Sequence, residues 1–278
     1  WHTSEGDPYL TITVNGHREH HRLRGKQARR WLAAQFYAKE QKGPGSQALQ
    51  EALDVLEGQA LFEGAEHPVS VRLALQDDTI FLDLGDDTWQ AVAVGATGWR
   101  IVAEPPVYFR RPKGMLPVPT PIAGGTVAEL WTFLNITDAN DRRLIVSWLA
   151  AALRPTGPYT VLNLSGEQGT AKSTTTRVLV ALVDPRTVPL RAAPKNDHDL
   201  MIAAVNGWVV ALDNLSSLPE GLSNSICRLA TGSGLSTREL YSDGDEALFD
   251  ATRPVIINGI KDLGSKGDLL DRAVRVTL

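Results

Sequence analysis

The chain has 278 residues, enough for one large domain or for a core domain with a smaller partner. Its net charge of -4 gives no global support for nucleic-acid binding, and its single cysteine, Cys227, excludes an internal disulfide. No run of about 18 apolar residues occurs, so we expect no membrane span and a cytoplasmic location. The sequence starts at Trp1, without an initiator methionine or a signal peptide, so we expect a piece of a longer protein.

The first 105 residues predict a small α+β module. Residues 9–14 alternate between apolar and polar side chains, and the Asn15-Gly16 pair that follows suits the two-residue turn of a hairpin. Helical spacing and then short apolar runs predict the elements that come next. The expected helices cover 26–41 and 46–62, and the expected strands cover 69–75, 79–84, 89–94 and 99–104.

Basic residues are concentrated near the start of the chain. Residues 1–50 hold eight Lys or Arg and four Asp or Glu, and the densest part, 17–30, reads HREHHRLRGKQARR. Two interpretations stay open: this segment attracts phosphate backbones, or it is the solvated surface of a hairpin and a helix. His17, His20 and His21 are close in sequence, but a hairpin need not bring them together, so metal binding there is the less favoured hypothesis.

An aspartate-rich stretch, 76–87, reads QDDTIFLDLGDD and raises the hypothesis that the N-terminal module polymerises nucleotides. Two-metal chemistry needs carboxylates that converge on one site. Asp77 with Asp78, and Asp86 with Asp87, stand at expected turns. We therefore interpret them as solvated loop tips.

A proline-rich connector, residues 106–124, marks a domain boundary, because proline sustains neither a helix interior nor a central strand. Beyond it, 126–136 and 139–153 carry apolar residues at helical spacing, and we expect these helices to brace the domain that follows. The third part of the chain is therefore 125–278, a helical brace with a core domain.

From Tyr159 onward, strands alternate with helices, which predicts a parallel sheet with helices on its faces. The expected fold class is α/β, with the five-stranded core of an AAA+ type P-loop ATPase. The five strands are expected at 159–164, 187–190, 208–213, 253–258 and 273–278.

The segment 166–173 reads GEQGTAKS, which departs from the phosphate-binding pattern GxxxxGK[ST] because Ala171 replaces the second glycine. That pattern curls backbone N–H groups around a β-phosphate, with Lys172 on the β and γ oxygens and the Ser173 hydroxyl on Mg²⁺. Alanine is tolerated there if its φ stays negative. The preceding apolar strand favours this interpretation over an ordinary glycine-rich turn. The predicted ATP-binding residues are Gly166, Glu167, Gln168, Gly169, Thr170, Ala171, Lys172, Ser173 and Thr174.

A second acidic element follows in WVVALDNL, 208–215, whose apolar run ends at Asp213. The pattern places a carboxylate beside Mg²⁺, so Ser173 and Asp213 form the predicted metal site, although a strand terminus or a helix N-cap would look the same. The next residue is Asn214, where hydrolysing ATPases of this class usually carry Glu or Asp. Asparagine orients water but cannot accept its proton. Three alternatives stay open: Asp213 both binds Mg²⁺ and activates the water, another carboxylate such as Glu167 activates the water, or turnover is slow.

Two later residues complete the predicted catalytic set. Asn258 is the first polar residue of an apolar strand, where it would hold water or the γ-phosphate; the alternative is an Asn-Gly turn. Arg272 comes just before the last strand, where a cation could reach the nucleotide of a neighbouring subunit; the alternative is an ion pair with Asp268 or Asp271. The full catalytic set is Lys172, Asp213, Asn214, Asn258 and Arg272.

The phosphate loop, Asp213, a predicted hairpin at 236–252, Asn258 and Arg272 follow one another in this order. From about 125 to 278 the chain thereby resembles a family of phage- and mobile-element-encoded ATPases, which are similar to superfamily-3 helicases and poxvirus-type primase-helicases. The resemblance implies ATP and Mg²⁺ as cofactors, with ATP phosphates at the loop, Mg²⁺ at Ser173 and Asp213, a sensor at Asn258 and a finger at Arg272.

The resemblance also implies an assembly and a function. It implies a hexameric ring around DNA, with Arg238 near the subunit interface, acting as a helicase or translocase in replication of a phage or mobile element. The hairpin tip, Asp243 to Glu246, departs from the family, because it carries carboxylates where the family usually carries Lys or His. Carboxylates repel the phosphates that such a tip would contact. The alternative function is an ATP-dependent assembly or regulatory switch, for example in defence, with little unwinding.

Overall fold

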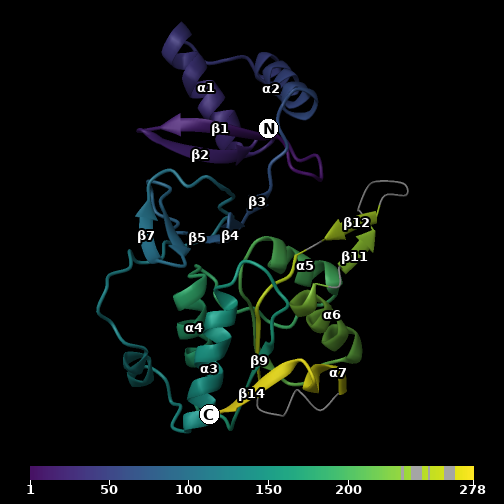
Figure 1. Ribbon diagram of the computed structural model, residues 1–278. Coiled ribbons are helices and arrows are strands. Elements are labelled where there is room, and N and C mark those ends of the chain that lie inside the picture. Colours follow the sequence, from purple (N-terminus) through teal and green to yellow (C-terminus); the bar gives the residue numbers. More distant parts are fainter. Residues whose placement is uncertain (233–234, 239–245, 250, 260–266) are drawn as a thin grey trace. The chain divides into compact units, whose positions relative to one another are not determined.

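The structure is a computed structural model in which the chain forms two compact units (Figure 1). No helix among its described residues is long and apolar enough to cross a lipid bilayer. The structure describes residues 1–232, 235–238, 246–249, 251–259 and 267–278. The N-terminal unit consists of 1–83 with 87–110, and the C-terminal unit of 84–86 with 111–278.

The N-terminal unit opens with the predicted hairpin and two helices. Asn15 and Gly16 have φ values of 47° and 86°, the positive values that the tight turn needs, so this turn prediction is confirmed. Leu23 and Leu53 are buried together where the helices meet the hairpin. The elements are β1 (Tyr9–Val14), β2 (His17–Arg22), α1 (Lys26–Glu40) and α2 (Ser46–Phe62).

An antiparallel sheet and a short parallel pair make up the rest of this unit. The sheet order is β4-β5-β6-β7, and β3 pairs with β8. Asp77 and Asp78 have positive φ in the β4–β5 turn, as loop tips do, and no described residues form a cluster of three potential metal ligands. The strands are β3 (Val69–Ser70), β4 (Leu73–Gln76), β5 (Thr79–Asp83), β6 (Ala91–Gly95), β7 (Gly98–Val102) and β8 (Tyr108–Phe109).

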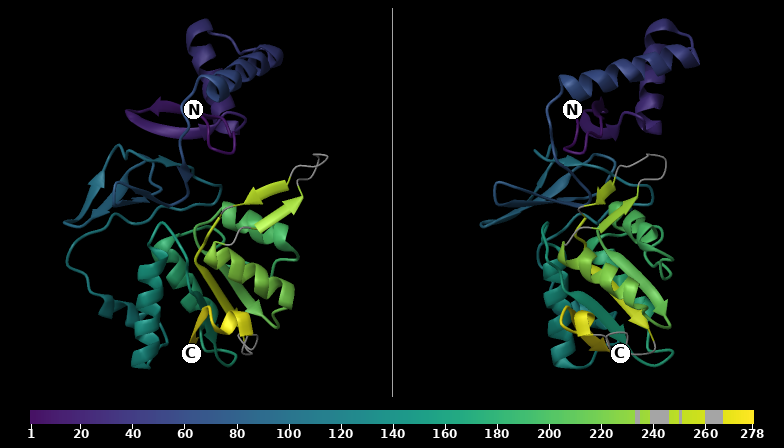
Figure 2. Two further views of the ribbon diagram at one scale, coloured as in Figure 1. Left: turned by 45° about the vertical axis from the view of Figure 1, so that its right-hand side comes forward. Right: turned by 90° about the vertical axis from the view of Figure 1, so that its right-hand side faces the viewer.

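The C-terminal unit is built on a parallel sheet of order β10-β13-β9-β14. Helices α3 and α4 cover one face of this sheet, and α5 and α6 cover the other (Figures 1 and 2). The elements are η1 (Val127–Thr132), α3 (Ala139–Ala152), β9 (Val161–Ser165), α4 (Lys172–Val183), α5 (Asp197–Val205), β10 (Val210–Leu215), α6 (Glu220–Thr231), β11 (Leu235–Arg238), β12 (Glu246–Phe249), β13 (Val255–Gly259), α7 (Gly267–Leu270) and β14 (Ala273–Thr277).

The fifth parallel strand, expected at 187–190, is not confirmed. The chain passes the edge of β10 there, but it forms only one isolated bridge, between Arg191 and Leu212. The Arg191 N–H donates to the Ala211 carbonyl at 2.9 Å, and the Asp213 N–H donates to the Arg191 carbonyl at 2.8 Å. Pro189 has no N–H to extend the ladder, so the fold is a mixed α/β core with four parallel strands.

The predicted helical brace is confirmed in one of its two parts. Helix α3 covers the expected residues, and the Trp148 indole N–H donates to the Thr160 carbonyl at 3.0 Å, which ties α3 to the residue before β9. The segment 126–136 forms a short 3₁₀ helix in place of an α-helix. Thr126 and Glu129 form a capping box at its start.

Candidate nucleotide-binding site

The loop 166–171 joins the carboxyl end of β9, an inner strand of the sheet, to the first turn of α4. No side chain in the described part of the chain caps α4 at its N-cap residue, Ala171. The N–H groups of a first helical turn have no partner within the helix, and the helix dipole favours negative charge beside them. This end of α4 therefore has the chemistry of an anion site.

Lys172 folds back over the loop. Its ammonium donates to the Gly166 carbonyl at 2.9 Å and to the Glu167 carbonyl at 2.6 Å, and lies 3.5 Å from the Thr170 hydroxyl. Phosphate oxygens could replace these oxygens as the hydrogen-bond acceptors of the Lys172 ammonium. Gly166 has φ 153°, and a Cβ there would lie 2.5 Å from the Leu278 carbonyl oxygen, so only glycine fits at this position.

Three predicted residues from separate elements meet beside the loop. The Ser173 hydroxyl donates to Asp213 Oδ1 at 2.7 Å, and Asn258 Nδ2 donates to the same oxygen at 2.7 Å. Within the described residues, no hydrogen bond reaches Asp213 Oδ2. A serine hydroxyl and a carboxylate are hard oxygen donors of the kind that Mg²⁺ prefers. The residues present therefore fit a magnesium ion at this place.

Asn258 also connects this cluster to the neighbouring backbone. It is 1% exposed, its Nδ2 donates to the Thr176 hydroxyl at 2.9 Å, and its Oδ1 accepts from the Asn214 N–H at 2.8 Å. A buried carboxamide bonded in this way is fixed in one orientation. Asn214 itself is exposed and has φ 56°, a left-handed conformation in which asparagine is enriched.

Sequence reasoning missed Thr176 and Arg275. The Thr176 hydroxyl donates to the Lys172 carbonyl at 2.9 Å, and Arg275 Nε donates to the Ser165 hydroxyl at 3.0 Å. Thr176 could have been found, because it lies one helical turn after Lys172 and Ser173 on the same face. Arg275 could not, because it reaches Ser165 only through the pairing of β14 with β9.

Burial distinguishes the other predicted loop residues from this cluster. Glu167, Gln168 and Thr174 are exposed, and only their backbone belongs to the loop and the first turn of α4. Arg191, whose carbonyl accepts from the Asp213 N–H, is half-buried. Burial lowers the pKa of the Arg191 guanidinium, and the nearby charge of Arg186 lowers it further.

The φ angle of Ala171 contradicts the sequence-based expectation. Its φ is +68°, so it occupies the left-handed region and does not keep the negative φ expected for an alanine in this loop. The conformation costs a residue with a Cβ about 1–2 kcal/mol, which is why glycine is favoured here. Ala171 therefore holds a backbone conformation that glycine adopts without strain.

We expect Ala171→Gly to stabilise the C-terminal unit. Relief of the left-handed strain outweighs the extra freedom of glycine in the unfolded chain and leaves a net gain of up to about 1 kcal/mol. A gain of that size raises the melting temperature by about 2–4 °C for a unit of this length. Thermal unfolding followed by circular dichroism measures it. A lower melting temperature, as glycine causes inside a regular helix, would contradict the φ assigned to Ala171.

Arg272 is not brought to this cluster. It precedes β14, and its carbonyl accepts from the N–H of Val161, at the amino end of β9. The loop lies at the carboxyl end of β9, about 13 Å away along the strand. Arg272 therefore has no place in this chain's own site, and a role toward a neighbouring subunit stays a prediction.

The predicted hairpin is present as β11 paired antiparallel with β12. It comes before β13, at the end of the sheet opposite the loop (Figure 1). The tip residues Asp243 and Asp245, and the side chains of Arg238, Glu246 and Asp268, lie outside what the structure describes.

The histidines of β2 point to different partners. His17 and His21 contact the Glu19 carboxylate at 3.0 and 2.7 Å, whereas His20 contacts Thr11 across the hairpin. Burial favours the neutral form of Glu19, but the hydrogen bonds with His21 and His17 outweigh it and lower the pKa of Glu19. The three histidines do not form a common metal site.

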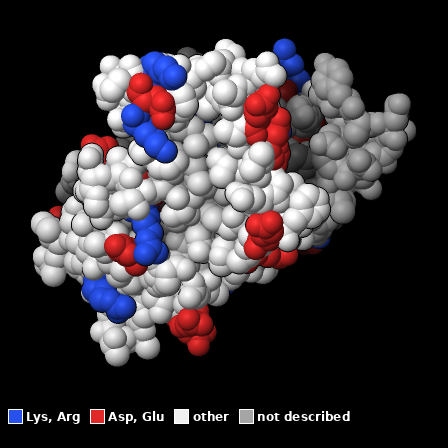
Figure 3. Space-filling view, turned by 90° about the horizontal axis from the view of Figure 1, so that it is seen from above, with Lys and Arg blue, Asp and Glu red and all other residues white. Residues whose placement is uncertain are grey.

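Three of the six Lys and Arg side chains in segment 17–30, those of Arg18, Arg22 and Arg24, form ion pairs. Arg22 pairs with Asp7 at 2.6 Å, and Arg24 pairs with Asp54 at 2.8 Å. Figure 3 shows Lys and Arg side chains beside Asp and Glu side chains on the face that it presents. Of the two open interpretations, this pairing favours a solvated surface over a phosphate-binding patch.

The fold and the site together define a class: a mixed α/β core with a glycine-containing loop between a parallel strand and a helix, and a carboxylate near the end of a second parallel strand. The family model described as "Actinomycete integrative conjugative element replication protein" matches residues 127–278. The chain belongs to this family. The predicted origin in a mobile element is thereby confirmed.

Two solved structures are similar to this chain at low sequence identity. The C-terminal region of NrS-1, in its A form without ligand, is 14% identical with a TM-score of 0.50, over 97% of this chain and 56% of that chain. A JCV helicase structure is 15% identical with a TM-score of 0.37, over 56% of this chain and 46% of that chain. The chain thus spans about half the length of each solved chain. No curated protein sequence matches it.

Proposed function

We propose that the C-terminal unit binds ATP with Mg²⁺ and hydrolyses it to drive a DNA helicase or translocase in replication of the mobile element. One observation carries this proposal: the 2.7 Å hydrogen bond from Ser173 to Asp213, two residues 40 positions apart in the chain. It places a hydroxyl and a carboxylate together at the N-terminus of α4, beside Lys172. Membership of a replication protein family supports the biological setting.

The roles of the residues follow from their contacts. Lys172 would exchange the Gly166 and Glu167 carbonyls for β- and γ-phosphate oxygens, and the first N–H groups of α4 would bind the same anion. Ser173 and Asp213 would hold Mg²⁺, which neutralises charge on the β- and γ-phosphates during transfer. Asn258 orients the Asp213 carboxylate through the hydrogen bond to Oδ1.

The chain has no carboxylate at position 214 to activate the attacking water. Asn214 is exposed and orients water without accepting its proton. Glu167 is an exposed carboxylate in the loop itself. We infer that Asp213 or Glu167 takes the proton and that turnover is slow compared with ATPases that carry a carboxylate at position 214.

The direct test of this function is ATP hydrolysis by the full chain at low salt, with and without single-stranded DNA. We expect hydrolysis that DNA stimulates and DNA retention that rises with ATP. Electron microscopy with a non-hydrolysable ATP analogue then tests for the proposed hexameric ring. Absence of both stimulation and DNA retention would contradict the helicase proposal.

A second function is favoured by Asn214: an ATP-dependent assembly switch with little unwinding. An exposed asparagine in place of a catalytic carboxylate suits a protein that binds ATP and hydrolyses the bound ATP slowly. Analytical ultracentrifugation without DNA separates the two proposals. An ATP-dependent change of oligomeric state with hydrolysis near background would support the switch, and DNA-stimulated turnover would exclude it.

A further inference from the structure

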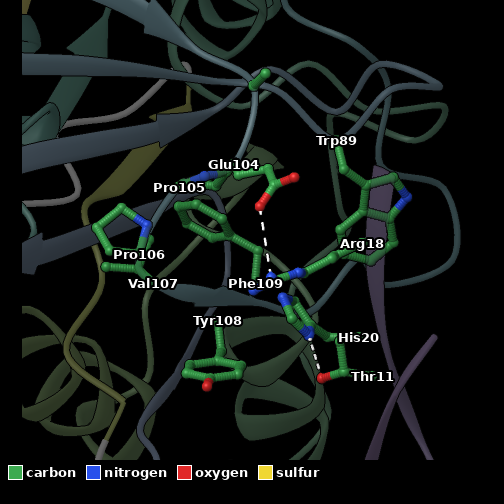
Figure 4. Close-up of a pocket in the computed structure, with 11 residues that line it drawn as sticks. Thr11, Arg18, His20, Trp89, Glu104, Pro105, Pro106, Val107, Tyr108 and Phe109 are labelled. Carbon is green, nitrogen blue, oxygen red and sulfur yellow. Dashed lines mark hydrogen bonds and ion pairs between the residues drawn. The ribbon is translucent and has the colours of Figure 1, made fainter. Parts of the chain in front are cut away.

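A pocket of about 320 Å³ lies within the N-terminal unit (Figure 4). Its lining residues come from β1, from β2, from the loop before β6 that holds Trp89, and from the segment 103–109, which ends in β8. The polar lining includes Thr11, and the apolar lining includes Pro105. This volume is near the lower end of the range for small-ligand sites, so it suits one compact ring system.

Aromatic rings form the walls of this pocket. His20 and Tyr108 have ring centroids 4.8 Å apart, and His20 meets Trp89 edge-on at 5.9 Å. Behind them, Tyr108 stacks on His67 at 4.3 Å with an interplanar angle of 21° and lies 4.7 Å from Trp1. The wall is therefore held in place by neighbouring rings, and a planar ligand would not have to order it.

Trp89 has a backbone conformation that calls for an explanation. Its φ is +58°, a region that bulky side chains rarely occupy, and it is half-buried against the pocket. Such a conformation costs about 1–3 kcal/mol and persists where the surroundings fix it, most often at ligand sites. Trp89 lines the pocket and also packs against the buried cluster that includes Phe81 and Ala91.

Polar groups stand beside these rings. Arg18 and Glu104 form an ion pair at 3.6 Å and are both largely exposed, so a guanidinium and a carboxylate meet at the pocket (Figure 4). The pocket thus offers aromatic faces together with hydrogen-bond donors and acceptors. A nucleobase has the matching chemistry, with a flat π face and donors and acceptors along its edge.

We propose that this pocket binds one base of single-stranded DNA by stacking on Trp89 and Tyr108. The inference rests on the proposed function in DNA replication. A free nucleotide is disfavoured because its phosphates would meet an arginine that Glu104 already neutralises. In a DNA strand, the phosphates continue outward from the pocket. Since stacking and not phosphate contact supplies the binding energy, the pocket contributes little to the salt dependence of binding.

The test is DNA binding by full chains, measured as the fluorescence anisotropy of labelled oligo-dT. Trp89→Asn removes the ring while keeping a residue that tolerates positive φ. We expect it to weaken binding about 5- to 150-fold, the loss that corresponds to about 1–3 kcal/mol for one stacked base. Trp99→Ala is the matched control, because Trp99 is an exposed tryptophan on β7 outside the pocket, and it should bind as the wild type does.

An abasic strand of the same length separates base stacking from backbone contact. We expect the wild type to lose affinity for the abasic strand, and Trp89→Asn to bind both strands alike. Equal oligo-dT binding by wild type and Trp89→Asn would overturn the pocket proposal while leaving the helicase proposal intact. Thymidine monophosphate that displaces oligo-dT at equal concentration would show a free-nucleotide site and also overturn it. Absence of DNA binding by the wild type would contradict the proposed function itself.

Discussion

Lys172→Ala is expected to weaken ATP binding by at least about 30-fold, the lower end of the 2–5 kcal/mol that removal of one partner of a desolvated charge pair costs. Among the described residues, the Lys172 ammonium contacts oxygens of its own loop, at 2.6–3.5 Å. The fold should survive the change, because these contacts tie the side chain to its own loop. Titration calorimetry with ATP and Mg²⁺ measures the loss.

The matched control for this variant is Arg177→Ala. Arg177 lies on the exposed side of α4, so its removal deletes one positive charge from the same helix without touching the loop. We expect it to bind ATP as the wild type does. If both variants lose affinity equally, the effect is general electrostatics and the assigned role of Lys172 is wrong.

Asp213→Asn is expected to lower the rate of ATP hydrolysis about 10²- to 10³-fold, the scale of losing one group aimed at transition-state charge. The amide oxygen of asparagine can still accept the hydrogen bonds from Ser173 and Asn258, so the melting temperature should change little. The steady-state rate at saturating ATP and Mg²⁺ measures the effect.

Asp271→Asn provides the comparison for Asp213→Asn. Asp271 is an exposed carboxylate before β14, near the end of the sheet opposite the loop, and its neutralisation should leave hydrolysis unchanged. Hydrolysis by Asp213→Asn at the wild-type rate would remove this carboxylate from the mechanism and would leave Glu167 as the remaining candidate base.

Local signals predicted most of the elements that build the site. Alternation and an Asn-Gly pair marked the first hairpin, and an apolar run followed by GEQGTAKS marked the junction of β9 with α4. The strand that ends near Asp213 was found in the same way. These features depend on neighbours in sequence, so composition and spacing are sufficient to locate them.

Features that depend on distant residues could not be predicted. The positive φ of Ala171 follows from the loop as a whole, and in place of the strand expected at 187–190 only Arg191 bridges to the edge of β10. The aromatic pocket joins β2 with Trp89 and Tyr108, and no spacing rule connects these segments. Pattern reasoning located the candidate residues of the core, while tertiary structure determined their conformations and partners.

The central claim is that one nucleotide with its magnesium ion binds between Lys172 and Asp213. Its most direct test is ATP titration of the wild-type chain by calorimetry, with Mg²⁺ and again with excess EDTA. We predict one site per chain and a clear loss of affinity in EDTA, because Ser173 and Asp213 supply the oxygen ligands of the metal. Absence of binding, or equal affinity in both buffers, would contradict the account.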